Sequence, residues 1–160
     1  MNTSQQEQIE RLYFDMFENL KAYACSSLKS DSLAEEAAQE TFSIACQNPE
    51  KLLSSDNPRG WLVITLKNTI RNMQRSRMAA QNLLNTYLQI YNHEPPALEQ
   101  TADPKLLYEN VADTKEFRLL VELAIEGRSH KEMARTRGIS LAACKKRVER
   151  AKKILQKNIE

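Results

Sequence analysis

Two segments of the chain place cationic and amide side chains at helical spacing. The first contains Lys67, Asn68, Arg71, Asn72 and Arg75, in a stretch from residue 57 to residue 92 that lacks any acidic residue. Lysine and arginine bind phosphates and the O6 and N7 atoms of guanine, and asparagine donates and accepts at base edges. This pattern is typical of a helix that binds nucleic acid. A solvated helical face is the alternative interpretation.

The second segment lies near the C-terminal end. A short helix, a turn at Gly138 and a longer helix capped by Ser140 form the pattern of a helix-turn-helix. On the longer helix, Lys145, Lys146 and Arg150 could enter a major groove, and its N-terminus could face a phosphate. An ordinary α-hairpin with a basic outer face is the alternative interpretation.

The net charge of +2 is an average over four blocks of opposite sign. Residues 1–58 have a net charge of −6 and residues 78–127 of −5, whereas residues 59–77 have +5 and residues 128–160 have +8. Both candidate segments lie in the basic blocks. The segregation therefore indicates two separate contacts with a polyanion.

The sequence offers little for catalysis or metal binding. No paired-carboxylate, Ser/His/Asp, Cys/His or glycine-rich phosphate motif occurs at a useful spacing, so we expect no enzyme activity and no cofactor. His93 and His130 are isolated, and Cys25, Cys46 and Cys144 are scattered. Reduced thiols are therefore expected, rather than a zinc site or disulfides.

Composition favours a soluble all-α protein. The 160 residues are 41% hydrophobic and 28% charged with only 3 Gly, and no apolar run approaches the ~20 residues of a membrane span. Residues 1–8 are polar and lack the apolar core of a signal peptide. We therefore expect a cytoplasmic location without membrane insertion.

Apolar periodicity and capping residues predict the elements that position these side chains. The first helix covers residues 4–28, the second is capped by Asp31 or Ser32, and Asn57 caps the third, with a polar loop over residues 48–56 before it. The pattern could continue as helix from residue 78 to residue 92, and residues 93–104, with three prolines, indicate a linker. Further helices are expected over residues 113–127, 131–135 and 141–157.

Each predicted helix has an apolar side. Trp61, on the first turn of the third helix, is interpreted as a core anchor in preference to a base-stacking residue. The positions expected to face inward are Ile9, Leu12, Tyr13, Met16, Phe17, Leu20 and Ala24 on the first helix, Leu33, Ala34, Ala37, Ala38, Thr41, Phe42 and Ala45 on the second, Leu62, Leu66, Thr69 and Met73 on the third, and Cys144, Val148, Ala151 and Leu155 on the last.

Three motifs in order carry a family resemblance. Residues 34–42 (AEEAAQETF) resemble the pattern A-E-D/E-x-x-Q-E-T-F, and residues 57–75 resemble R-x-W-L…N…R. The third motif, the helix-turn-helix, has two parts: residues 126–140 resemble G-x-S-x-x-E-I-A and its turn, and residues 145–151 resemble K-S-R-x-x-R-A. The chain thus resembles a bacterial RNA polymerase sigma factor of the extracytoplasmic-function group of the sigma-70 family.

This resemblance implies two small helical domains on a flexible linker. Residues 1–80 would be a three-helix sigma region 2 domain, residues 81–112 the linker, and residues 113–160 a helix-turn-helix sigma region 4 domain. Their partners would be promoter DNA, core RNA polymerase through the clamp of its largest subunit and the flap of the second, and an anti-sigma factor.

The resemblance also implies residue roles. The clamp would be contacted by Glu35, Glu36, Gln39 and Glu40. The −10 element would be bound by Trp61, Lys67, Asn68, Arg71, Asn72 and Arg75, with the loop of residues 48–56 as a pocket for a flipped base. The −35 element would be bound by Ser140, Lys145, Lys146 and Arg150.

Some residues depart from the family pattern. Asp113-Thr114 replaces the usual Leu-Pro, Ala143-Cys144 replaces Thr-Val, and Arg137 replaces the leucine before the turn glycine. Few aromatic residues occur on the third helix, so the protein is expected to melt DNA weakly. A one-component repressor or activator, which would need a dimer interface or a ligand pocket in its first half, is the alternative function.

Overall fold

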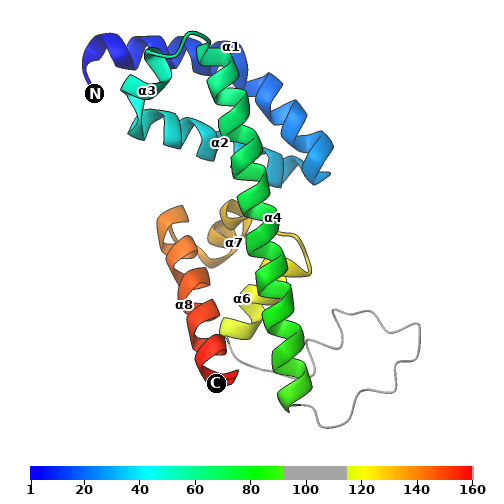
Figure 1. Cartoon of the computed structure of the whole chain (residues 1–160). Helices are drawn as coiled ribbons and strands as arrows, with labels where there is room; N and C mark the ends of the chain where they lie inside the picture. The colour runs from blue at the N-terminus through cyan, green and yellow to red at the C-terminus, as the bar shows by residue number, and fades with distance from the viewer. Residues whose placement is uncertain (92–114, 160) are drawn as a thin grey trace. The chain divides into compact units, whose positions relative to one another are not determined.

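The computed structural model describes residues 1–91 and 115–159, and over these residues all regular elements are α-helices (Figure 1). In chain order they are α1 (Thr3–Leu28), α2 (Asp31–Gln47), α3 (Pro49–Leu53), α4 (Pro58–Tyr91), α6 (Lys115–Ala124), α7 (His130–Arg137) and α8 (Leu141–Ile159). The all-α prediction is confirmed for this part of the chain. The chain divides into two compact units, Met1–Gln74 (unit 1) and Arg75–Glu160 (unit 2), and the division falls within α4.

In unit 1, α1 and α2 form a hairpin with a two-residue turn. Lys29 adopts the left-handed conformation (φ 54°) and ends α1. Ser30, in an extended conformation, caps α2, and its Oγ accepts a hydrogen bond of 3.2 Å from an N–H of the first turn. Asp31 and Ser32, the predicted caps, lie inside the helix instead. The prediction was wrong because the left-handed turn at Lys29 brings the chain into position for a cap one residue earlier.

The core of unit 1 follows the predicted apolar pattern closely. All seven positions expected to face inward on α2 are buried, whereas α1 buries Ile9, Met16, Leu20 and Ala24. Tyr13 was assigned to the same stripe but lies at its exposed edge, with its ring centroid 4.8 Å from Phe17 and 5.0 Å from Phe42. Four alanines at the inner side of α2 let the two helices approach closely.

The segment before α4 is more ordered than a polar loop. Residues 48–56 contain the short helix α3, with proline at its first position and Leu52 fully buried in the core of unit 1. Asn57 caps α4 as predicted, because its Oδ1 accepts a hydrogen bond of 3.0 Å from the Gly60 N–H. The first half of α4 then buries Leu62, Leu66, Thr69 and Ile70, with Met73 half-buried.

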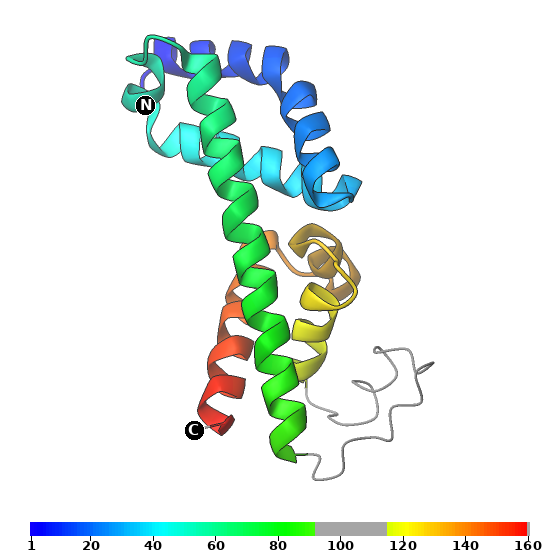
Figure 2. The ribbon, with the colours of Figure 1, turned by 45° about the vertical axis from the view of Figure 1, so that its right-hand side comes forward.

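Unit 2 consists of α6, α7, α8 and the second half of α4, which lie side by side in Figures 1 and 2. Ala80 and Leu84 are fully buried in its core, and the Tyr87 ring lies 5.4 Å from the ring of Phe117 on α6. Residues 81–91 continue α4, as the apolar pattern from residue 78 to residue 92 allowed, and Leu84 lies in the core of unit 2, although the family resemblance assigned this segment to the linker. Residues 92–112, the remainder of that linker, and Asp113, the expected start of the next helix, lie outside the described residues.

The short connections of unit 2 match the predicted capping residues. Ser129 caps α7 by accepting from the Glu132 N–H at 3.2 Å, and Gly138 ends α7 in the left-handed conformation (φ 64°). Ser140 accepts from the Ala143 N–H at 3.1 Å at the start of α8. The helix α7 is longer at both ends than the predicted 131–135. Within residues 1–91 and 115–159, no helix is both long and apolar enough to cross a bilayer.

Candidate nucleic-acid interface

Side chains for polyanion binding line the outer side of α4. We call Lys67, Asn68, Arg71, Asn72 and Arg75 the α4 basic face; all five are exposed, and Arg75 is the first residue of unit 2. Successive residues of a helix are ~100° apart, so the four-residue steps from Lys67 to Arg71 and Arg75 keep these cations on one side. The opposite side of the helix carries its buried leucines. Helix α4 therefore has one side that faces the core and an opposite side that carries basic and amide side chains.

The cations of the α4 basic face are not neutralised locally. Among the described residues, none of Lys67, Arg71 and Arg75 forms an ion pair. The nearby Arg59 does pair with Asp15 on α1, at 3.3 Å between two exposed side chains. Cations without an ion-pair partner keep the positive electrostatic potential that attracts an anionic ligand. When the ligand is a polyanion such as DNA, its binding is also favoured by the release of the counterions that the polyanion had condensed.

Trp61 is half-buried and packs against the core of unit 1. This position agrees with the preferred interpretation as a core anchor. Ile64, by contrast, is 62% exposed. The sequence analysis did not single it out, although its position, two residues after one buried leucine and two before the next, places it on the outer side of the helix.

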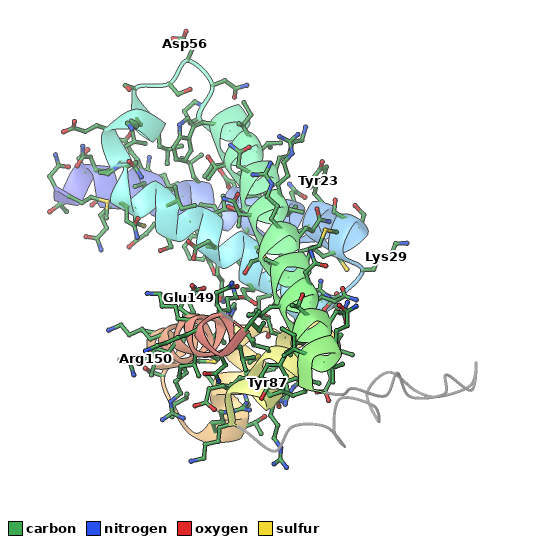
Figure 3. All side chains as sticks on the ribbon, turned by 60° about the horizontal axis from the view of Figure 1, so that its bottom comes forward. Tyr23, Lys29, Asp56, Tyr87, Glu149 and Arg150 are labelled. Carbon is green, nitrogen blue, oxygen red and sulfur yellow. The ribbon has the colours of Figure 1, made fainter. Side chains whose placement is uncertain are left out.

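The loop expected to hold a flipped base lies just before α4. Asp56 is exposed at its tip, as Figure 3 shows, and α3 forms its first half. The assignment of a base pocket to residues 48–56 stays a prediction.

The residues assigned to polymerase binding lie on α2. Glu35, Glu36, Gln39 and Glu40 are all half-buried, and the Gln39 Nε2 donates to Glu35 Oε1 at 3.2 Å. They flank the buried side of the helix, so they are less exposed than an outer face would be. We call these four residues the α2 acidic face.

The residues assigned to the −35 element lie at the start of α8. Lys146 and Arg150 are exposed, whereas Lys145 is half-buried and Ser140 uses its Oγ for the cap. Figure 3 labels Arg150 on the outer part of this helix. The predicted inner stripe, Cys144, Val148, Ala151 and Leu155, is fully buried. Helix α8 thus has a buried apolar inner side and a basic outer side.

An ion-pair network fixes α7 against α6. Glu122 on α6 accepts from Arg128 Nη1 at 2.6 Å and also from Arg137 Nη2, at the last turn of α7. Arg128 additionally donates to Thr136 Oγ1 at 2.6 Å. Arg137, which replaces an apolar residue of the family pattern, is therefore held by a carboxylate. Sequence reasoning missed Glu122 because nothing in the spacing links it to two arginines in later segments.

A basic cavity of about 560 Å³ lies between α6, the end of α7 and α8. Its lining consists of five cationic side chains, one carboxylate and three apolar side chains. The lining residues are Lys115, Glu116, Arg118, Leu119, Arg137, Arg147, Arg150, Ala151 and Ile154. Arg150 thus borders both the outer side of α8 and this cavity.

The described residues contain no group of three His, Cys, Asp or Glu side chains that could hold a metal ion. All three cysteines are free thiols. The Cys25 thiol donates to Asp31 Oδ1 at 3.3 Å, and this hydrogen bond, with the nearby negative charge, raises the pKa of Cys25.

Comparison with protein families places these surfaces in context. The Sigma-70 region 2 model matches residues 16–79, a range that contains the α2 acidic face and all of the α4 basic face. This domain belongs to sigma factors of RNA polymerase, in which it binds core polymerase and promoter DNA. Neither the comparison with curated proteins nor the comparison with solved structures gave a match.

Proposed function

We propose that this chain is a sigma factor of bacterial RNA polymerase, a non-enzymatic subunit that directs the core enzyme to promoters and starts transcription. The observation that carries the proposal is the Sigma-70 region 2 match over residues 16–79, because the unpaired α4 basic face lies within it. The order of the sequence motifs supports the extracytoplasmic-function group. Such a subunit works in the cytoplasm, where its polymerase and promoters are.

In this proposal the α4 basic face binds the −10 element. Arg71 and Arg75 contact phosphates or guanine, and Lys67 contacts phosphate. The amides of Asn68 and Asn72 read base edges. The exposure of all five side chains and the lack of ion pairs among the described residues support this assignment. Trp61 contributes indirectly, because it anchors the first turn of the helix in the core of unit 1.

The −35 element is assigned to the start of α8. Lys146 and Arg150 lie on its outer side, Lys145 lies beside them, and the N-terminus at Ser140 faces a phosphate. In this proposal residues 113–160 are the −35-binding domain and residues 1–80 are the −10-binding domain. Ala80, the last residue of the first of these domains, and Leu84 are both buried in the core of unit 2, and the two compact units divide earlier, between Gln74 and Arg75.

The polymerase contact is assigned to the α2 acidic face, which would dock on the clamp of the largest subunit, while unit 2 would meet the flap of the second. The two DNA contacts are each modest, and joining them through polymerase raises the effective concentration of the second after the first forms. An anti-sigma factor would control the chain by covering one of these faces.

The test is complex formation with core polymerase. The chain and core enzyme should co-elute in gel filtration at equal stoichiometry, and Glu36→Lys combined with Glu40→Lys should abolish co-elution without unfolding the chain. Glu7→Lys with Glu10→Lys, an equal charge change on exposed positions of α1, is the matched control and should still co-elute. A stable dimer that ignores polymerase would contradict the proposal and favour the one-component regulator.

A further inference from the structure

An exposed aromatic ring from α1 lies beside the α4 basic face. The Tyr23 side chain is part of unit 1 and 43% exposed, and the Lys67 Nζ lies 5.9 Å from its ring centroid. Figure 3 shows Tyr23 beside α4. The two residues are far apart in the sequence, so no local pattern indicates this contact.

The ring of Tyr23 has no packing role comparable with that of Tyr13. Tyr13 contacts the rings of Phe14, Phe17 and Phe42, and so belongs to an aromatic cluster. Among the described residues, Tyr23 has no aromatic neighbour, and its ring contact is with Lys67. A cation 5.9 Å from a ring is at the outer limit of a cation–π contact, so Lys67 can leave the ring for a phosphate at little cost.

The surface that Tyr23 joins is suited to an unpaired strand. It combines cations for the backbone, amides for base edges and now a π-face, the combination found in grooves for single-stranded nucleic acid. Within a duplex the faces of each base are covered by its neighbours, whereas an unpaired base can stack on an aromatic side chain. The ring therefore adds a preference for unpaired DNA that the cations alone do not provide.

We propose that Tyr23 stacks on an unpaired base of single-stranded DNA while Lys67 binds the adjacent phosphate. The inference deepens the proposed function, since a strand opened at the −10 element would supply the base. It also bears on the expectation of weak melting, which counted aromatic residues on the third helix alone. In this proposal Tyr23 on α1 supplies an aromatic ring that the count on the third helix did not include.

The test measures binding of the full chain to a fluorescein-labelled, mixed-sequence 20-nucleotide single strand and to the matching duplex, by fluorescence anisotropy at fixed salt. Tyr23→Leu removes the ring and should weaken single-strand binding about tenfold, the loss of one base stack, while duplex binding changes less than about twofold. Tyr23→Phe keeps the ring and should bind the single strand like the unaltered chain.

Phe14→Leu is the matched control. Phe14 lies on the same helix, is 83% exposed, and is nine residues away, which places it on the opposite side of α1. It should leave both affinities unchanged. Equal losses on single strand and duplex, no loss for Tyr23→Leu, or a Tyr23→Phe variant as weak as Tyr23→Leu would each overturn the inference.

Two further measurements keep the outcome clear. If Tyr23→Leu lowers the midpoint of thermal unfolding, its binding measurement is replaced by photo-crosslinking of the unaltered chain to a single strand that contains 5-iodouracil. Tyr23 is the expected crosslinking site, and a site outside α1 and α4 would overturn the inference. Complex formation with core polymerase needs no DNA. A chain that binds polymerase but shows no ring dependence refutes the inference alone, whereas a chain that stacks the strand but ignores polymerase refutes the proposed function alone.

Discussion

Replacing Leu84 by alanine tests whether the second half of α4 belongs to the core of unit 2. Leu84 is fully buried, in one cluster with Phe117, Val148 and Leu155. Truncating a buried leucine costs about 2–5 kcal/mol, and we expect about 2–3 kcal/mol because a small helical unit can close partly around the cavity. A unit of this size is stable by roughly 5–10 kcal/mol, so the loss is a substantial fraction of the total.

Hydrogen exchange of the full chain, followed by mass spectrometry, gives the assay. If α6 and α8 exchange through unfolding of unit 2, Leu84→Ala should accelerate their exchange about 30- to 140-fold, at a factor of ten for each 1.4 kcal/mol. Peptides of α1 and α2 should not change. Ile90→Ala, on the same helix at an exposed position, is the control and should leave α6 and α8 unchanged. Acceleration confined to residues 75–91 would refute the reasoning and restore the linker interpretation.

Three further outcomes are expected. Arg71→Ala and Arg150→Ala should each weaken promoter binding by the holoenzyme about fivefold or more, and each should lower the slope of log affinity against log salt concentration by about one. Filter binding at several salt concentrations measures both effects, and an unchanged slope would contradict a phosphate contact. Gly138→Ala should lower the free energy of unfolding of unit 2 by about 1–2 kcal/mol, because alanine is strained in the left-handed backbone conformation of this position. The added Cβ would meet no atom of a non-neighbouring residue within 4 Å, so the backbone strain is the whole effect. Urea unfolding followed by circular dichroism measures the change, and an unchanged free energy of unfolding would be the contrary result. Cys46, which is exposed, should react with iodoacetamide faster than Cys25, whose raised pKa keeps the thiol protonated; labelling of Cys25 should rise with pH, and equal rates at neutral pH would contradict the Asp31 hydrogen bond.

The local features of the fold were readable from the sequence because local chemistry determines them. The caps at Asn57, Ser129 and Ser140 and the left-handed Gly138 each depend on a residue type and on the few residues that follow it. The inward side of α2 follows directly from the spacing of its apolar residues. The cap of α2 was misplaced because Ser30, Asp31 and Ser32 are all suitable caps, and only the left-handed turn before them decides between them.

Contacts between distant segments could not be read in the same way. The apolar residues around Leu84 allow a helix, but the sequence does not say that α6 and α8 cover them. Likewise, Glu122 meets Arg137, and Tyr23 meets Lys67, only after the helices have packed. The candidate DNA-binding residues were found because exposure on one side of a helix is a local property, whereas the aromatic ring beside them depends on tertiary packing.

The central claim is that the chain directs polymerase to promoters, and mapping of transcription start sites tests it most directly. Core polymerase is incubated with genomic DNA, with and without the chain, and the 5′ ends of the transcripts are sequenced. The account predicts a discrete set of starts that depends on the chain, shares a −10 and a −35 sequence, and disappears with Arg71→Ala combined with Arg150→Ala. Starts that are the same with and without the chain would contradict it.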